Sequence, residues 1–243
     1  MPLDFVNLKL TAGILLVLAG IAIGFMAAMN ANQHFLNAGI GVAVIGVILM
    51  AFSERRRFEH LILPYHESLK RIAEFTEVKK AVYIPPFGNF TCGAVFLAAS
   101  NEFEIDISRL DLNSPFVSGR EKEMGILLEA PGKEILKKFE EYAELNLSNY
   151  GIGVSEICSS VLKALELADE VEIEENEELK ITISGAKVDF CSDDCKLIQC
   201  PICSSVLSAI AKAIGELIAV DDFRVGDKIE IRVKKLGGIE RWI

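Results

Sequence analysis

The sequence predicts an α+β protein, in which an N-terminal transmembrane helical hairpin is followed by a soluble domain with a mainly antiparallel sheet. Two observations predict this fold class. Two long apolar runs stand at the start of the chain, and a helix–strand–strand pattern occurs twice in its C-terminal part. The chain accordingly divides into a hairpin (residues 1–53), a helical juxtamembrane connector (54–79) and a soluble α+β domain (80–243).

The hairpin is predicted from the length and composition of the apolar runs. Residues 10–29 carry no charge, and residues 35–52 contain a single polar member, Asn37. Each run is long enough to cross a hydrocarbon core of ~30 Å as a helix. The short segment between them allows only a tight turn. A cleaved signal peptide would be shorter, and a second span would not follow it.

Basic residues flanking the runs predict the orientation in the membrane. Arg55, Arg56 and Arg57 follow the second run directly, whereas the turn carries no Lys or Arg. Because Lys and Arg accumulate on the cytoplasmic side, both termini are expected in the cytoplasm. We therefore expect a two-pass protein of the cell membrane, with the lipid bilayer as a partner and the C-terminal domain in the cytoplasm.

Small residues recur at seven-residue spacing along both runs. They are Gly13, Gly20 and Ala27 in the first run, and Gly39, Gly46 and Ser53 in the second. Small side chains let membrane helices approach closely, so the pattern predicts packing of the two helices on each other. Homo-oligomerisation through the same residues is the alternative.

The connector and the first half of the soluble domain are predicted from short apolar runs and proline breaks. A helix with a break at Pro64 leads from the membrane into the domain. Strands are expected at residues 81–84, 92–98, 103–107 and 125–128. Pro131 then opens a helix at its first turn, and its buried face is expected to contain Ile135, Leu136, Phe139 and Ala143.

The second half of the domain contains an internal repeat. Residues 157–162 and 202–207 have the same sequence, Ile-Cys-Ser-Ser-Val-Leu, 45 positions apart. Further matches join Leu179, Ile181 and Ile183 to Ile229, Ile231 and Val233 at an offset of 50. We predict two helix–strand–strand units, residues 155–185 and 200–238, whose strands combine in one sheet with helices on one face. The alignment places Ser155 and Cys200 at equivalent helix N-caps, with Pro201 at N1 and Cys203 at N3.

Four of the six cysteines lie close together at positions Cys191, Cys195, Cys200 and Cys203. Three interpretations stay open. The cysteines can be small buried residues or form an incidental disulfide. They can bind zinc or an iron–sulfur cluster, although their spacing is not a standard one. They can also perform thiol redox chemistry, because a thiol at a helix N-terminus is more easily ionised.

Charge and missing motifs exclude several functions. The chain has a formal net charge of −10, and the acidic excess lies after residue 60, which disfavours nucleic-acid binding. There is no Walker A motif, no GxGxxG after a strand and no HExxH. We therefore favour a membrane-anchored binding or scaffold module without enzymatic activity or cofactor, acting on an unidentified protein partner. The alternative is a thiol-redox, zinc or iron–sulfur site built on the four clustered cysteines.

Three short motifs follow the hairpin. They are Val-Tyr-Ile-Pro-Pro at residues 82–86, Gly-Ile-Leu-Leu-Glu-Ala-Pro-Gly at 125–132 and Cys-Pro-Ile-Cys-Ser-Ser at 200–205. Together with the hairpin, they resemble a family of uncharacterised archaeal two-pass membrane proteins with a cytoplasmic α/β domain of unknown function. The resemblance spans nearly the whole chain and implies an archaeal host. It brings no activity and no site residues.

Overall fold

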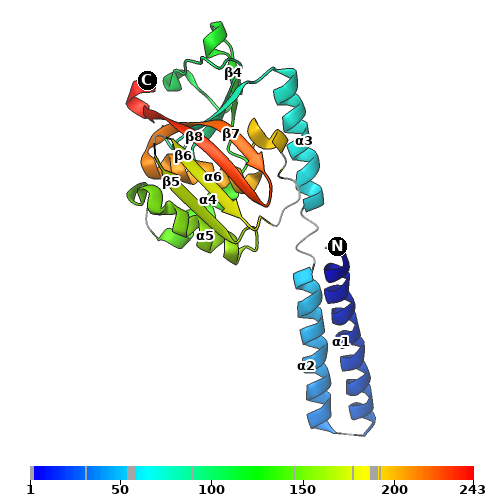
Figure 1. The fold of residues 1–243 in the computed structure, drawn as a ribbon. Helices are drawn as coiled ribbons and strands as arrows, with labels where there is room; N and C mark the ends of the chain where they lie inside the picture. The colour runs from blue at the N-terminus through cyan, green and yellow to red at the C-terminus, as the bar shows by residue number, and fades with distance from the viewer. Residues whose placement is uncertain are drawn as a thin grey trace. The chain divides into compact units, whose positions relative to one another are not determined.

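The computed structural model describes residues 3–30, 32–53, 59–88, 90–144, 146–176, 178–186, 191 and 193–243. Its architecture is α+β, as predicted, with N-terminal apolar helices followed by an antiparallel sheet domain (Figure 1). The chain forms two compact units, Met1–Pro64 and Tyr65–Ile243. The predicted orientation signal, Arg55 to Arg57, lies outside the described residues.

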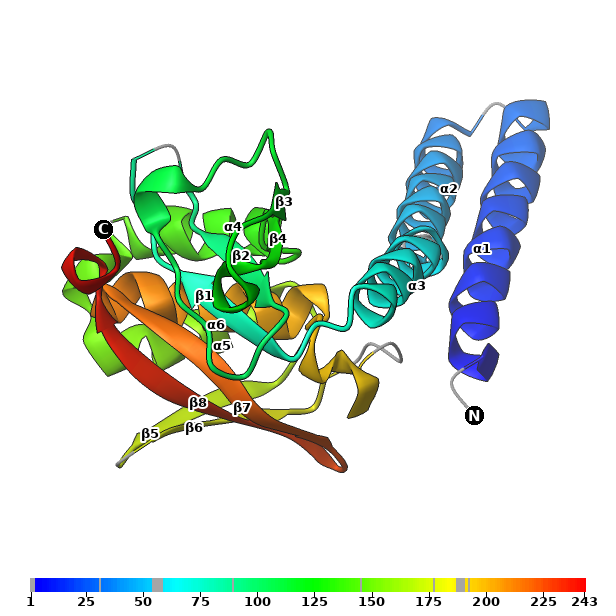
Figure 2. The same ribbon diagram turned by 90° about the horizontal axis from the view of Figure 1, so that it is seen from above.

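The first unit contains helices α1 (Leu3–Met29) and α2 (Gln33–Ser53). By length and composition, their segments Thr11–Met29 and Gln33–Met50 could each cross a membrane. The two helices lie side by side and are joined by a short turn (Figures 1 and 2). The unit therefore has the form of a helical hairpin.

Glycines form the contact between α1 and α2. A Cβ atom on Gly20 would lie 2.5 Å from the backbone nitrogen of Ala43, and one on Gly39 would lie 2.8 Å from the carbonyl oxygen of Gly20. A Cβ atom on Gly46 would lie 2.8 Å from the carbonyl oxygen of Gly13. Larger side chains would separate the two backbones. The predicted packing of small residues within the hairpin is therefore confirmed.

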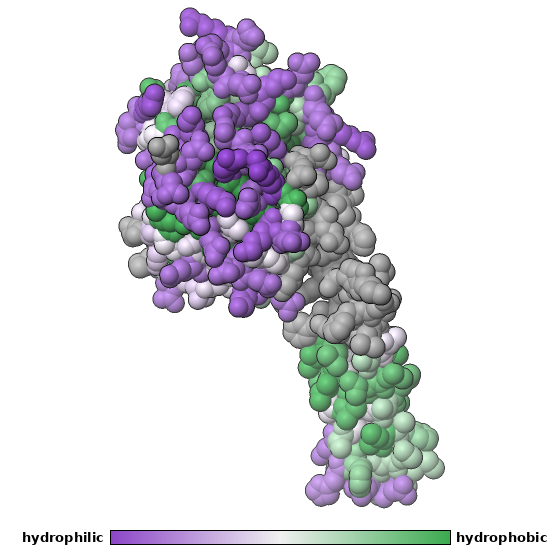
Figure 3. Space-filling view, viewed as in Figure 1, coloured by the Kyte–Doolittle hydropathy of each residue, from purple (hydrophilic) through white to green (hydrophobic). Residues whose placement is uncertain are grey.

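Large apolar side chains cover the outside of the hairpin, which is predominantly hydrophobic in Figure 3. The exposed ones are Ile14, Leu15, Leu18, Ile21, Phe25, Met26 and Met29 on α1, and Phe35, Ile40, Val44, Ile45, Val47, Ile48 and Leu49 on α2. A soluble monomer rarely exposes a continuous apolar surface of this extent.

Helix α3 (Glu59–Phe75) leads to the sheet. It continues through Pro64, so the predicted break there is wrong. Proline near the start of a helix removes only one backbone hydrogen bond, and the remaining turns hold the helix together. At the other end, Ala73 is buried and Leu69 packs against the core, whereas Phe75 is exposed.

Within the described residues, the sheet has eight strands in the order β3-β4-β2-β1-β7-β8-β6-β5, and all neighbours pair antiparallel. It is strongly twisted (Figure 2). The strands are β1 (Lys80–Ile84), β2 (Ala94–Ala98), β3 (Phe116–Val117), β4 (Gly125–Leu128), β5 (Glu170–Glu175), β6 (Leu179–Ser184), β7 (Glu216–Val225) and β8 (Lys228–Gly238).

Helices α4 (Lys133–Ala143), α5 (Val154–Ala164) and α6 (Pro201–Ile214) cover one face of the sheet and form the larger core with it (Figure 1). On the other face, a smaller core joins β1, β2, β4 and β7 to Phe90, to the segment 103–117 and to the C-terminal turn η7 (Ile239–Trp242). Helix α4 approaches α6 closely at Gly132, where a Cβ atom would lie 2.6 Å from the Cα of Ser205.

Two predicted elements of the first half differ in the structure. Residues 103–107 are not a strand. Ile105 and Ile107 are buried in the smaller core, and Asp106 caps the 3-10 helix η2 (Ile107–Arg109) by accepting from the N–H of Ser108 at 3.1 Å. The alternation therefore arose from a coil packed on the sheet. Helix α4 begins at Lys133 rather than at Pro131, because Gly132 is its N-cap.

Both helix–strand–strand patterns of the repeat are present, as α5-β5-β6 and α6-β7-β8. The two units meet where β6 pairs with β8. The pairs are Leu179 with Val233, Ile181 with Ile231, and Ile183 with Ile229. Each residue of β6 in these pairs has its counterpart on β8 at an offset of 50. Replacing every residue by its counterpart in the other unit therefore gives the same set of pairs. A pseudo-two-fold axis therefore passes between the equivalent residues Ile181 and Ile231.

The equivalence fails at the start of the helices. Ser155 is not an N-cap, because α5 begins at Val154 and Gly153 precedes it in a helical conformation (φ −59°, ψ −8°). The 3-10 helix η5 (Gly151–Gly153) runs directly into α5, so the chain has no extended residue there. In α6, by contrast, Cys200 is extended and caps the helix.

Candidate metal centre

The first turn of α6 presents two of the predicted cysteines. Cys200 is the N-cap with extended backbone (φ −60°, ψ 160°), and Pro201 occupies the first helical position, where its missing N–H is no loss. The Sγ of Cys200 accepts a hydrogen bond from the backbone N–H of Cys203 at 3.5 Å. The predicted helix positions of these three residues are confirmed.

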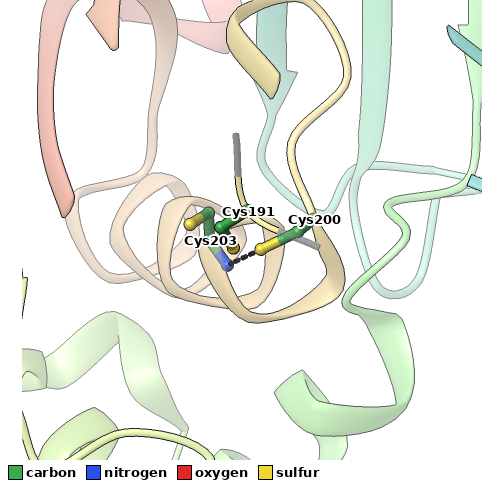
Figure 4. Close-up of side chains that lie close together, drawn as sticks. All are labelled: Cys191, Cys200 and Cys203. Carbon is green, nitrogen blue, oxygen red and sulfur yellow. Dashed lines mark hydrogen bonds between the residues drawn. The ribbon is translucent and has the colours of Figure 1, made fainter. Parts of the chain in front are cut away.

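Cys191 reaches the same point from the segment before the 3-10 helix η6 (Asp193–Lys196) (Figure 4). The Sγ atoms of Cys191, Cys200 and Cys203 all lie within 4.8 Å of one another. Cys200 and Cys203 are fully buried, whereas Cys191 is half-buried. None of the cysteines, all of which are among the described residues, is in a disulfide. We refer to these three residues as the three-cysteine site.

Cys195 was predicted as the fourth member of the set. It is not among the three sulfurs that lie within 4.8 Å of one another, but it is near enough to interact electrostatically with Cys191. It is buried on η6 and belongs to the larger apolar core. The first repeat unit has a cysteine, Cys158, at the position equivalent to Cys203. Burial raises the pKa of Cys158 strongly, which keeps this thiol neutral. Among the described residues, several cysteines come together only at the start of α6, where Cys191 meets Cys200 and Cys203.

The three thiols share hydrogen bonds unequally. Burial disfavours a charge on Cys200, but hydrogen bonds from Cys191, Cys203 and backbone N–H groups of the first turn outweigh it and hold the pKa of Cys200 well below its ordinary value. The pKa of Cys191 is raised, first by its hydrogen bond with Cys200. The pKa of Cys203 is raised by its hydrogen bonds with Cys191 and Cys200 and by burial. The hydrogen bonds within the site therefore favour a negative charge on Cys200 over one on Cys191 or Cys203.

Accessibility argues against thiol–disulfide exchange with another protein. Exchange begins when an exposed thiolate attacks a disulfide of the partner. Cys200 and Cys203, which form the Cys-Pro-Ile-Cys sequence, are both 0% exposed. A partner could therefore reach only Cys191. A small ion can reach all three sulfurs with less rearrangement, so the arrangement is better suited to metal binding.

A buried polar link joins this region to the sheet. The phenol Oη of Tyr83, on β1, donates a hydrogen bond to the Oε1 of Gln199 at 2.7 Å. The Nε2 of Gln199 donates to the carbonyl oxygen of Lys196 at 2.6 Å. Burial raises the pKa of Tyr83 well above its ordinary value, so the phenol stays protonated. Neither Tyr83 nor Gln199 was predicted from the sequence. The two residues are 116 positions apart, and no local pattern connects them.

Two equivalent serines show how differently the two units use the same position. In the first unit, Ser159 accepts from the N–H of Val171 at 2.8 Å and donates to its carbonyl oxygen at 3.1 Å. Val171 lies on the edge strand β5, so Ser159 occupies backbone groups that another strand could otherwise bind. In the second unit, Ser204 lies beside Tyr83, and its buried hydroxyl has no hydrogen bond of standard geometry among the described residues.

Comparison with protein-family models finds a match for this chain. A family model described as "Domain of unknown function (DUF7982)" matches residues 6–234. The match spans both the hairpin and the sheet domain, and agrees with the uncharacterised family expected from the sequence motifs. No curated protein and no solved structure matches the chain.

Proposed function

We propose that this chain, which belongs to the family described as "Domain of unknown function (DUF7982)", is a membrane-anchored binding module that holds one zinc ion on Cys191, Cys200 and Cys203. The observation that carries the proposal is the mutual distance of at most 4.8 Å between the three sulfurs. With Zn–S bonds of about 2.3 Å, thiolates on a tetrahedral zinc ion stand about 3.8 Å apart. The three sulfurs therefore need to draw together by no more than about 1 Å.

A single ion suits the site better than an iron–sulfur cluster. The thiolates of a cluster bind different irons and spread around it, and clusters usually take four cysteines. Three sulfurs so close to one another surround one ion. Zinc is redox-inactive, prefers thiolate and imidazole ligands, and would keep one coordination position for a further ligand.

Metal analysis of the purified full chain in detergent tests the proposal. We expect about one zinc per chain after anaerobic purification, and loss of this zinc in Cys191→Ser, Cys200→Ser and Cys203→Ser. Cys92→Ser is the matched control, because Cys92 is half-buried and outside the three-cysteine site. Absence of metal from the wild-type chain, or full retention in Cys200→Ser, would contradict zinc binding.

The proposed membrane anchor is supported by the exposed apolar surface of α1 and α2. Burying such a surface in lipid removes it from water, which is favourable in proportion to its area. We expect the chain to stay with the membrane after an alkaline carbonate wash. Release into the wash would contradict the anchor, whatever the cysteines bind.

The proposed cytoplasmic orientation rests on the basic triplet after the second run. An impermeant thiol reagent should leave Cys92 unmodified in intact cells and should modify it after lysis and mild denaturation. Labelling in intact cells would place the sheet domain outside. The resemblance to archaeal two-pass proteins supports the further proposal of an archaeal host. A protein partner of the anchored domain also remains part of the proposal.

A further inference from the structure

We infer that Tyr83 and Gln199 are positioning residues of the three-cysteine site: their hydrogen bond fixes the segment that presents Cys200, and so prepares the site for its metal ion. The inference rests on the proposed zinc binding. Neither residue binds the ion directly. Both act by holding the backbone that positions Cys200.

The link has a rigid support at one end. Tyr83 lies on β1, in the interior of the sheet, where it pairs with Val95 of β2 on one side and with Ile218 of β7 on the other. Its side chain is 1% exposed. A phenol held in this way is a fixed point from which a hydrogen bond can hold a less regular segment.

The other end of the Tyr83–Gln199 hydrogen bond lies directly beside Cys200, a proposed zinc ligand. Gln199 is 1% exposed and precedes Cys200, and its amide holds both the phenol of Tyr83 and the carbonyl oxygen of Lys196. These two bonds fix the turn between η6 and α6. Because Cys200 must enter α6 in an extended conformation (φ −60°, ψ 160°), a fixed Gln199 sets the direction from which its sulfur reaches Cys191 and Cys203.

The repeat supplies an internal comparison. Val154 matches Gln199 in the sequence, 45 positions earlier, and it is 0% exposed. It is the first residue of α5, however, whereas Gln199 lies before the N-cap of α6. The first unit therefore has neither the amide nor the extended cap residue that follows it. A buried amide is unfavourable unless its hydrogen bonds are formed. Gln199 makes both of its hydrogen bonds next to Cys200 of the three-cysteine site, and this position points to a role in the site.

Hydrogen bonds behind the ligands of a metal ion hold them in the geometry that the ion needs. Removing one typically weakens metal affinity by about 10- to 100-fold. We expect this range for Tyr83→Phe and for Gln199→Met. Because both variants break the same link, the double variant should bind zinc no more weakly than the weaker of the two single variants. The stoichiometry should stay at about one zinc per chain.

The experiment measures zinc affinity by competition with a chelator, on the full chain in detergent, together with the thermal midpoint of each variant. Ser159→Ala is the matched control. It removes a half-buried hydrogen-bonding side chain from the equivalent helix of the first unit, away from the three-cysteine site. It should lower the midpoint and leave zinc affinity unchanged. Cobalt absorption then reports whether thiolates still bind the ion in each variant.

The outcomes separate the inference from the proposed function. Zinc affinity 10- to 100-fold weaker in Tyr83→Phe and Gln199→Met, with thiolate absorption retained and Ser159→Ala normal, supports positioning. Wild-type affinity in both variants overturns the inference but leaves zinc binding intact, provided that Cys200→Ser abolishes it. Weakened affinity in Ser159→Ala would also overturn the inference, because affinity would then follow stability. A wild-type chain that binds no zinc refutes the proposed function itself.

Discussion

Replacing Gly132 with Ala should destabilise the sheet domain. Gly132 is the N-cap of α4 and lies against the first turn of α6. An added Cβ atom would lie 2.6 Å from the Cα of Ser205, and closer still to the Ser205 nitrogen and the Pro201 carbonyl oxygen. All three are backbone atoms, so no flexible side chain can move aside. One helix would have to shift.

The magnitude follows from two opposing effects. Inserting a methyl group into a packed interior costs about 1–3 kcal/mol. Alanine restricts the unfolded chain more than glycine does, which returns about 0.4–1 kcal/mol where the backbone conformation suits it. Because the first effect is the larger, we expect a net loss that lowers the thermal midpoint by several degrees, roughly 2–8 °C for a unit of this size.

Tryptophan fluorescence can follow this unfolding. Trp242 is the only tryptophan of the chain. It stacks on Phe103 at a ring-centroid distance of 6.2 Å and packs against the smaller core, so it reports on the sheet domain. The control is Gly153→Ala, where no atom lies within 4 Å of the added Cβ. A Gly132→Ala midpoint equal to that of the wild type and of the control would refute the close approach of α4 and α6.

Three further predictions concern other parts of the chain. Ser159→Ala should lower the stability of the sheet domain by about 0.5–1.5 kcal/mol, measured by urea unfolding, because two half-buried backbone groups of β5 lose their partner. Gly20→Val should separate α1 from α2, whereas Gly41→Val, with no atom within 4 Å, should not; a disulfide-trapping series across the hairpin distinguishes them. The pKa of Asp222 is lowered by the hydrogen bond from Arg232. Its stabilising effect should therefore be present above about pH 4 and be lost as pH falls below that, and Arg232→Ala should remove this part of the acid dependence of unfolding.

Elements with a strong local pattern were predicted well. The apolar runs and the seven-residue spacing of glycines identify the hairpin and its contact, because length and composition reveal a long apolar helix and small residues mark where two such helices approach. The repeat identifies both helix–strand–strand patterns. The register between β6 and β8 agrees with the repeat as well, since Ile181 and Ile231 are aligned in the sequence and paired in the sheet.

The predictions were wrong where packing between residues far apart in the sequence decided the local conformation. Residues 103–107 alternate like a strand, but they are a coil whose apolar side chains pack on the back of the sheet. Ser155 has the side chain of a good N-cap, yet η5 enters α5 without the extended residue that a cap needs. Neither difference is visible in a short window of sequence.

The candidate site was predicted in part, for a related reason. Cys200 and Cys203 are placed by helix geometry, which the sequence reports directly. Cys191 and Cys195 lie on a segment without a repeating pattern, so spacing could not decide which of them faces the helix. Tyr83 is 116 positions away from Gln199, and only the insertion of β1 beside β7 brings them together.

The pairing of β6 with β8 has a consequence for stoichiometry. Two identical chains that met around a true two-fold axis would share the same interface, in which each residue faces its counterpart. They would then carry every side chain twice, and any ligand site twice. In this chain the halves are covalently joined, so a substitution in one half is not copied into the other. One unit begins its helix directly from η5, whereas the other begins it with the N-cap Cys200. The two units can therefore pair like a symmetric dimer, while the three-cysteine site lies at only one of the two helix starts.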